Sequence, residues 1–402
     1  MKLVLALNSF GIGGTESYVL TVAEHLDRLA HEVVIYTPEG GHGEELANER
    51  GLTIASASRL PDNCDVAIVQ DAAVSLELAE LWPDTPQLFV CHSENFDPQA
   101  PPQLPGLVQA VVALNDRVAE RLAGFALKPK VVRLRQPIDT ERFHSRGPLP
   151  ELPRRALVLS NNHLSDRHAM LRSACVEAGM ELTHLGGAAG QSLDPLPDLA
   201  QADVVIGYGR SILEAMALGR AAYLYDWAGG NGWMTRESYP RIEANGFGGR
   251  SEPIVDADRL VDDLRRYSAT MGPVNRDLIS AHHRANVHVQ QLVELATGLA
   301  RPGDRPPAPL GEMARLVRLE WRARAEIHGL LVESAMLRSR LAELDLAKER
   351  QLMEADEAER QAQLESAREL ARATATYEQS LSWRLTKPLR AVGRALRRLT
   401  HR

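Results

Sequence analysis

Residues 204–219 constrain the fold of this chain more than any other stretch. The apolar run 204–206, bounded by glycines, is typical of a strand buried on both faces of a parallel sheet. Ser211 then stands where a helix N-cap is expected, and the pattern predicts a helix that ends at Gly219. A strand, a glycine turn and an abrupt helix start leave first-turn N–H groups unpaired beside the positive end of the helix dipole. This unit therefore predicts an anion site.

The polar residues of the same unit indicate the kind of anion. Arg210 lies in the turn after Gly209, and a guanidinium binds phosphate through two hydrogen bonds. Glu214 follows one turn into the helix, where a carboxylate suits paired hydroxyls better than phosphate. Together with Ser211 these residues predict a nucleotide-sugar site, in which Arg210 and Glu214 are candidate catalytic and donor-binding groups. Ordinary packing of a helix on a sheet is the alternative.

Composition limits the class of protein. A chain of 402 residues is expected to hold two or three domains, and 44% hydrophobic with 25% charged residues is typical of a soluble globular protein. The net charge of −7 argues against a general nucleic-acid binder. The three cysteines lack disulfide or metal-ligand spacing, which fits a reducing compartment. No apolar window has the length of a membrane span, and the N-terminal apolar run is too short for a secretory signal. A cytoplasmic protein is expected.

Strands and helices alternate along the chain in two rounds. Strands are predicted at 3–7, 32–36, 66–69, 87–91 and 110–114, and again at 156–160, 181–185, 203–206 and 221–225. Each round predicts a doubly wound α/β domain, over 1–145 and 154–300 respectively, joined by a proline-rich connector. A ligand cleft is expected between the two domains.

A second glycine loop, Gly11-Ile-Gly-Gly-Thr-Glu16, follows the first predicted strand and precedes a helix. It can also present backbone N–H groups to an anion. A dinucleotide-binding fingerprint is the rival interpretation. It needs a third glycine where Ser17 stands and an acidic residue where strand two ends in Tyr36, so nicotinamide binding is disfavoured.

Three motifs together resemble the GT-B-fold glycosyltransferases, in particular the large nucleotide-sugar-using group called family 4. They are the Gly-Gly-Thr-Glu loop, Gln136-Pro-Ile-Asp-Thr-Glu-Arg-Phe143 and Leu213-Glu-Ala-Met-Ala-Leu-Gly219, in the same order as in that family. The resemblance covers about residues 1–300. It implies an α/β fold of two Rossmann-like domains, a donor nucleotide-diphosphate sugar on the C-terminal one, and an acceptor on the N-terminal one. It also implies no cofactor and no obligate metal.

The resemblance also implies roles for single residues. Glu214 would hydrogen-bond the donor ribose, and Gly13 and Gly14 would face the donor diphosphate, with Thr15 and Glu16 on the acceptor side. His92, in Val-Cys-His-Ser-Glu after a predicted strand, resembles the histidine that faces the transferred sugar.

Two departures from the family pattern bear on activity. Family members carry a second glutamate eight positions before the helix glutamate, where this chain has Ile206. They also have an Arg and a Lys after the first strand of the second domain, where Arg167 is the only strong cation here. Arg210 would then neutralise the diphosphate. A catalytically silent GT-B-like scaffold and a nucleotide-sugar epimerase are the competing interpretations.

Two further glycine-rich segments, 226–237 and 245–250, follow in the second domain. Glycine-rich loops beyond the carboxyl end of a strand bind ligands in open α/β sheets. Simple turn formation is an equal alternative.

Past residue 300 the composition changes. A proline-rich stretch predicts a stiff linker over 301–311. Residues 312–375 predict a long helix with a short coiled coil and hence a homo-oligomer, because apolar residues recur at 3–4 spacing. These residues are Ala323, Ile327, Leu330, Leu337, Leu341 and Leu344. A single charged helix lying on the globular part is the alternative.

The last segment, 380–402, is basic and amphipathic. Its basic residues include Arg384, Lys387, Arg390, Arg394, Arg397 and Arg398. With Trp383 as an interface anchor, such a helix suits an anionic bilayer surface. The segment resembles tails of bacterial surface-polysaccharide glycosyltransferases, which implies a cell-surface polysaccharide or lipid-linked glycan acceptor and a peripheral position at the inner membrane. Docking on a protein partner is the alternative.

Overall fold

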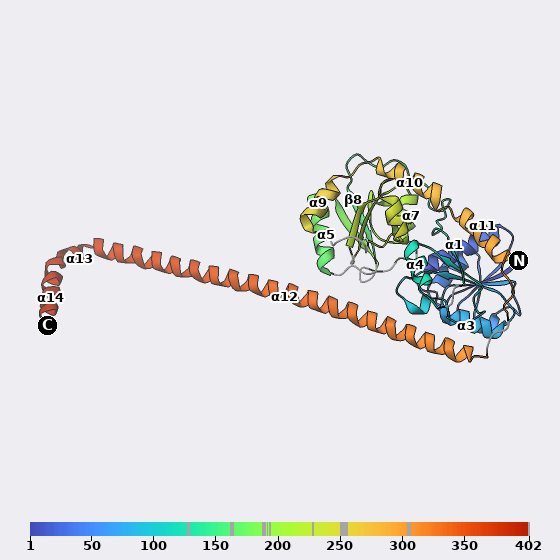
Figure 1. The fold of residues 1–402 in the computed structure, drawn as a ribbon. Coiled ribbons are helices and arrows are strands. Elements are labelled where there is room, and N and C mark those ends of the chain that lie inside the picture. Colours follow the sequence, from blue (N-terminus) through green and yellow to red (C-terminus); the bar gives the residue numbers. More distant parts are fainter. Residues whose placement is uncertain are drawn as a thin grey trace. The chain divides into compact units, whose positions relative to one another are not determined.

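The computed structural model describes residues 1–126, 129–160, 165–186, 190, 192, 194–226, 229–249, 256–303 and 307–400. The chain forms two compact units, Met1–Glu333 and Ser334–Arg402. The first unit contains two β-sheets, each covered by helices on both faces, and the start of a long helix (Figure 1).

The N-terminal sheet is entirely parallel, with strand order β3-β2-β1-β4-β5-β6-β7. Its strands are β1 (Lys2–Ala6), β2 (Glu32–Tyr36), β3 (Thr53–Ala55), β4 (Val66–Val69), β5 (Gln87–Cys91), β6 (Ala110–Ala113) and β7 (Lys130–Arg133). The central strands are buried on both faces, as their unbroken apolar sequences require. The strand order reverses between β1 and β4, and the crevice at the carboxyl ends of such strands is where open α/β sheets bind ligands.

Five helices cover this sheet. They are α1 (Gly14–Arg28), α2 (Gly43–Glu49), α3 (Ala72–Leu81), α4 (Asp116–Ala123) and α11 (Ala285–Thr297). Two of them begin with side-chain caps: the Asp71 carboxylate accepts from the Val74 amide, and the Asn115 side-chain carbonyl accepts from the Val118 amide. The late helix α11 packs against α1 and completes the N-terminal core, so the chain returns to its first domain after building the second.

The C-terminal sheet has the order β12-β11-β10-β8-β9. Its strands are β8 (Arg155–Leu159), β9 (Glu181–Leu185), β10 (Val204–Gly207), β11 (Ala221–Asp226) and β12 (Gly229–Trp233). The order reverses between β8 and β10, which again places a crevice at their carboxyl ends. The glycine-rich segment after β11 is not an open loop where the structure describes it, since β12 pairs antiparallel with β11 through Tyr223 and Trp233.

The helices of this domain are α5 (Ser165–Glu177), α6 (Leu196–Gln201), α7 (Arg210–Ala217), α8 (Tyr239–Ala244), α9 (Ala257–Arg265) and α10 (Met271–His282). The α7 helix lies on the sheet with its apolar side fully buried and packs on α10. The strands expected from the sequence are all present. The edge strands β3, β7 and β12 were not expected, because their sequences, Thr-Ile-Ala, Lys-Val-Val-Arg and Gly-Gly-Asn-Gly-Trp, are not apolar runs like those of the central strands.

The C-terminal extension is built on α12 (Leu310–Gln379), α13 (Leu381–Leu385) and α14 (Lys387–Thr400). The beginning of α12 packs against the N-terminal domain, where Ala314 is buried with Leu76, Ala79 and Leu107. In the second unit the apolar residues of α12 are mostly exposed. Within the described part of the chain, no helix combines the length and apolarity needed to cross a membrane.

Candidate active site

A cleft between the two domains has two adjoining lobes. The glycine lobe is a cavity of about 260 Å³ whose lining includes Gly13, Gly14, Ser160, Gly209, Ser211 and Glu214. The histidine lobe is a cavity of about 240 Å³ whose lining includes Gly14, Thr15, His92, Gln99, Arg210 and Phe247. Most of the residues that the sequence singled out therefore meet in one place.

Two helix N-termini, one from each domain, border the glycine lobe. The α1 helix starts after Gly13 and the α7 helix after Gly209, and neither N-cap residue offers a side-chain acceptor. The first-turn N–H groups of α7 are therefore available to an anion in the lobe, whereas at α1 the Glu16 carboxylate already accepts from the backbone N–H groups of Gly11 and Glu16. Both helix dipoles favour an anion there.

The expected N-cap at Ser211 is wrong. Gly209 takes that position at φ +61°, a conformation that glycine adopts without strain. Ser211 lies inside the first turn, and its hydroxyl donates to the Tyr208 carbonyl at 2.8 Å. The Ser211 hydroxyl thus bonds to a nearby backbone carbonyl, and Gly209 has no side chain that could accept from the first-turn N–H groups of α7.

Arg210 joins the two domains from inside the cleft. Its Nη2 donates to the Thr21 hydroxyl on α1 at 2.9 Å, and its Nη1 donates to the Pro137 carbonyl of the connector at 3.0 Å. Its Nε donates to Glu214 at 2.8 Å in an ion pair whose side chains are 7% and 8% exposed. Three of the five guanidinium N–H donors thus have protein partners. Burial raises the pKa of Glu214, and the charge of Arg210 opposes that rise.

Buried side chains hold three successive carbonyls in residues 135–137, where the chain leaves β7 and enters the proline-rich connector. Arg135 O accepts from His288 Nδ1 at 2.8 Å, Gln136 O from His283 Nδ1 at 2.8 Å, and Pro137 O from Arg210. Because each Nδ1 carries the proton, each Nε2 accepts from a tyrosine hydroxyl, Tyr18 and Tyr239 respectively, at 2.9 Å. The first two residues of the Gln-Pro-Ile-Asp motif, Gln136 and Pro137, are therefore fixed in place by hydrogen bonds from His283 and Arg210.

His92 is held as a neutral imidazole at the edge of the histidine lobe. Its Nε2 donates to Gln70 Oε1 at 2.7 Å, and its ring meets that of Tyr18 edge-to-face at 4.9 Å between centroids. Burial, with Arg210 and His288 nearby, lowers the pKa of His92 to about 3. With Nε2 protonated, Nδ1 keeps its lone pair and can accept a hydrogen bond.

The other predicted residues are distributed as follows. Thr15 lines the histidine lobe and accepts from Gln99 Nε2 at 3.3 Å. Glu16 folds back on its own helix start, accepting from backbone N–H groups there, and burial raises its pKa. Ile206 is fully buried in β10, so a hydrophobic group stands where the resemblance to glycosyltransferases predicts a second glutamate. The side chain of Arg167 lies outside what the structure describes.

Further residues of the cleft have no signal in the sequence. Tyr18, Gln70, His283 and His288 surround the connector and His92, but up to 270 residues separate hydrogen-bonded partners among them. Of the second glycine-rich segment, Gly246 and Phe247 line the histidine lobe. Nothing local distinguishes these residues from ordinary core or turn positions.

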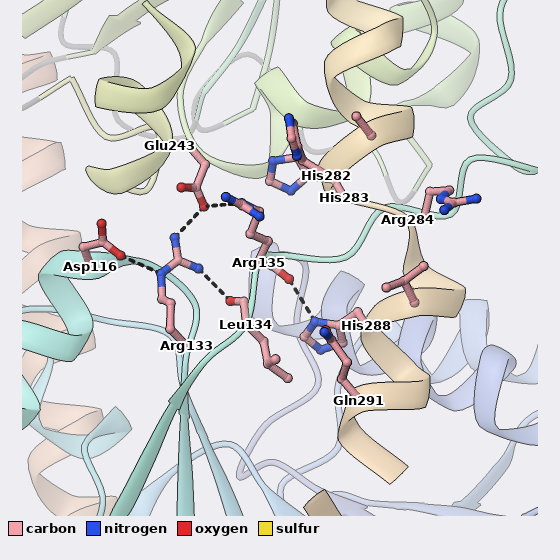
Figure 2. A pocket seen from close by; sticks show the side chains of 12 residues that line it. Asp116, Arg133, Leu134, Arg135, Glu243, His282, His283, Arg284, His288 and Gln291 are labelled. Carbon is pink, nitrogen blue, oxygen red and sulfur yellow. Dashed lines mark hydrogen bonds and ion pairs between the residues drawn. The ribbon is translucent and has the colours of Figure 1, made fainter. Parts of the chain in front are cut away.

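Behind the histidine lobe lies a third cavity of about 360 Å³, bordered by the connector and α11. Figure 2 shows Arg133 between Asp116 and Glu243, with the Arg135 carbonyl turned toward His288. Glu243 pairs with Arg133 and Arg135 and also lines the histidine lobe. Its two guanidinium partners tie α8 to the N-terminal sheet. No group of three or more His, Cys, Asp or Glu suited to a metal ion occurs among the residues the structure describes.

Solved structures share this architecture. Anabaena HepE in complex with UDP and glucose matches with a TM-score of 0.56 and 13% identity over 74% of this chain and 100% of that chain. HepE in complex with UDP-glucose matches at TM-score 0.54 and 12% identity, over the same shares. A glycosyltransferase from Rickettsia africae matches at TM-score 0.50 and 14% identity over 74% of this chain and 98% of that chain.

No protein-family model matches the sequence, and no curated protein matches it either. At such low identities the structural matches show the fold alone. The chain has the GT-B fold, with two Rossmann-like domains followed by a long helical extension.

Proposed function

We propose that this chain is a glycosyltransferase that moves a sugar from a nucleotide-diphosphate sugar to a cell-surface polysaccharide or lipid-linked glycan. The observation that carries the proposal is a single cavity bordered by two helix N-termini from different domains, each with a glycine at the N-cap. That arrangement suits a diphosphate, which carries negative charge on two adjacent groups. The neighbouring structures of HepE with UDP and UDP-glucose support the same ligand class.

In this proposal the donor lies in the glycine lobe. Backbone N–H groups at Gly14 and Arg210 stabilise the departing diphosphate, and Glu214 binds the ribose hydroxyls. Arg210 adds positive charge from the lobe wall, while two of its donors bind Thr21 and the connector and a third binds Glu214 on its own helix. No metal or cofactor takes part in this scheme.

The acceptor enters the histidine lobe, beside Thr15 and Gln99. His92 is neutral near pH 7, and its low pKa makes it a weak base, so its Nδ1 would orient an acceptor hydroxyl or accept a hydrogen bond from the donor sugar without taking a proton. Because both lobes share Gly14 and Arg210, the donor diphosphate and the acceptor would meet at those residues.

Calorimetry with a panel of nucleotide sugars, followed by transfer assays on lipid-linked acceptors, tests the proposal. Gly14→Ala is the diagnostic variant, because Gly14 lines both lobes. A Cβ added at this position would have no neighbour closer than 4.0 Å. The variant should fold normally and weaken nucleotide-sugar binding. Gly329→Ala, which meets nothing within 4 Å on exposed α12, should bind as wild type does. Wild-type protein that binds no nucleotide sugar would remove the proposal.

A catalytically silent scaffold is the second candidate, because Ile206 places a buried apolar group where the family has a carboxylate. Nucleotide-sugar binding without transfer or hydrolysis would favour it. Conversion of the bound sugar to its epimer in the absence of acceptor would instead indicate an epimerase.

The C-terminal extension suggests two further partners, an anionic membrane surface and other copies of this chain. The basic α14 helix and the exposed Leu381, Leu385 and Leu389 suit an anionic membrane surface, where the enzyme would be peripheral on the cytoplasmic side. The exposed leucines of α12 in the second unit suit a homo-oligomeric coiled coil.

A further inference from the structure

The root of α12, residues 310–333, belongs to the same compact unit as the two α/β domains. It contacts the carboxyl edge of the N-terminal sheet, where the ligand crevice of this domain lies. Arg318 Nε donates to Asn8 Oδ1, just past β1, at 2.8 Å, and its guanidinium also pairs with Glu77 on α3. Arg322 pairs with Glu39, in the loop after β2, at 2.7 Å.

Two other residues of the root contact the loop that follows β5. The rings of Trp321 and Phe96 meet edge-to-face at 5.0 Å between centroids. Arg324 pairs with Asp97 at 2.9 Å and lies over the Phe96 ring at 5.8 Å. Such aromatic pairs add stabilisation beyond their buried area, and the cation adds more.

The same loop forms a wall of the histidine lobe. His92 precedes it and Gln99 closes it, and both line the cavity. Gln99 Nε2 donates to Thr15 at 3.3 Å, while the Gln99 carbonyl accepts from the Cys91 thiol at 3.4 Å. Residues 93–99 therefore contact α12 on one side and the cleft on the other.

We propose that Trp321 and Arg324 are positioning residues of the acceptor site, which hold residues 93–99 in the shape that the acceptor requires. This inference rests on the proposed function, since it places the acceptor in the histidine lobe. It also makes the root of α12 a working part of the acceptor domain, although the sequence presents it as the start of a separate extension. The donor side is not involved, because no contact of the root reaches the described residues of the glycine lobe.

Steady-state kinetics on the full-length chain separate positioning from mere stability. Trp321→Ala should raise the acceptor KM by about tenfold, because a wall displaced by ~1 Å misplaces the acceptor. The affinity for nucleotide sugar and the circular-dichroism spectrum should stay unchanged. Trp321→Phe keeps an edge-to-face partner for Phe96 and should restore most of the acceptor KM. Arg324→Ala should act in the same direction as Trp321→Ala.

Arg322→Ala is the matched control. It lies on the same helix and removes one ion pair to the same domain, but its partner Glu39 does not touch the 93–99 loop. Its acceptor KM should equal that of wild type. Equal effects of Trp321→Ala and Arg322→Ala, or a loss of nucleotide-sugar binding in Trp321→Ala, would overturn the proposal.

Hydrogen exchange gives a readout that does not depend on transfer. Amides of residues 93–99 should exchange faster in Trp321→Ala than in wild type and Arg322→Ala, while those of α7 stay unchanged. If no sugar transfer is detected in wild type, the proposed function fails, and faster exchange still shows that Trp321 holds the loop. Unchanged exchange in Trp321→Ala overturns the positioning role, whatever the activity.

Discussion

Arg210, the first residue of α7 in the C-terminal domain, donates to the hydroxyl of Thr21 on α1 of the N-terminal domain at 2.9 Å. Arg210 lines both lobes of the cleft, and the same guanidinium also donates to the Pro137 carbonyl of the connector. The residue predicted to clamp a phosphate is thus also a clamp between domains. The guanidinium of Arg210 can therefore offer its charge to a ligand only while it also keeps its hydrogen bonds to Thr21 and to the Pro137 carbonyl.

Loss of that clamp should cost stability. Arg210→Ala leaves the buried carboxylate of Glu214 without its partner, and we expect the free energy of unfolding to fall by about 3–5 kcal/mol. Urea denaturation followed by circular dichroism measures the change. Arg210→Met combined with Glu214→Gln removes both charges and should lose less than Arg210→Ala alone.

The control for this loss is an exposed ion pair. Arg236 and Asp277 pair at 2.6 Å with side chains 60% and 63% exposed, so Arg236→Ala should change stability by no more than about 0.5 kcal/mol. An Arg210→Ala protein as stable as Arg236→Ala would show that the clamp contributes nothing.

Acid should destabilise the folded protein through its buried histidines. Burial lowers the pKa of His92 and His283 to about 3 and that of His288 to about 4, against about 6.5 in an unfolded chain. The stabilisation from the neutral rings is complete above pH 6.5 and is lost as the pH falls toward 4, because only the unfolded chain then binds the protons. Each histidine should add about 1.4 kcal/mol per pH unit to this slope.

Denaturation at several pH values between 7.5 and 4.5 measures the slope. His288→Gln removes one of these protons and should flatten it by the share of one group, while all other titrating groups stay the same in both proteins. A slope unchanged in His288→Gln would show that this ring binds its proton as readily in the folded protein as in the unfolded chain.

A glycine at the end of β10 should tolerate no side chain. A Cβ at Gly207 would lie 2.8 Å from the Leu159 carbonyl oxygen and 3.0 Å from Ser211 Oγ, so β8 and α7 would have to move apart. We expect Gly207→Ala to lose about 1–3 kcal/mol of stability and to weaken nucleotide-sugar binding. Thermal unfolding with and without ligand checks both.

Gly298→Ala serves as the comparison for Gly207→Ala. A Cβ at Gly298 would lie no closer than 3.5 Å to its neighbours, which is an ordinary contact. Its melting temperature should match that of wild type, and equal melting temperatures for the two variants would refute the crowding argument.

Truncation should separate the root of α12 from its remainder. A 1–333 protein keeps every described contact of the root with the N-terminal domain and should unfold as a full-length chain does. A 1–309 protein exposes Leu76 and Leu107 and leaves Glu77 without Arg318, a charged hydrogen bond of about 1.5–3 kcal/mol. It should melt at a lower temperature. Equal melting temperatures would mean that the root adds no stability.

Light scattering of the full-length and 1–333 proteins tests the coiled coil. Leu337, Leu341 and Leu344 are about as exposed as one another, at 61%, 61% and 59%, which is costly for a lone helix in water. We expect an oligomer for the full chain and a monomer for 1–333. Monomers of both would remove the homo-oligomer from the proposal.

The C-terminal helices should bind anionic vesicles. Each Lys or Arg near such a surface contributes about 1 kcal/mol, and exposed Leu385, Leu389 and Val392 add apolar insertion. Full-length protein should pellet with vesicles containing phosphatidylglycerol and less with neutral ones, whereas 1–379 should stay in the supernatant. Equal pelleting of the two proteins would assign the tail to a protein partner.

What the sequence by itself determined lies within short stretches of chain. Short apolar runs predicted the buried strands β1, β4 and β10, and the glycine loops predicted the helix starts at α1 and α7, because neighbouring residues decide strand burial and turn geometry. Even there the choice between Ser211 and Gly209 as N-cap was wrong. Serine and glycine both occur at helix N-caps. Which of them takes that position here depends on the direction in which the chain leaves β10 and enters α7.

The tertiary structure decided which distant groups meet. Arg210 bonds to residues 73 and 189 positions away, and Tyr18 bonds to His288 across 270 positions. Trp321 carries the same local helix pattern as the exposed residues that follow it, yet it packs on Phe96. Partner choice over such separations depends on how two finished domains and a returning helix close on one another, and no local preference of the chain encodes that geometry.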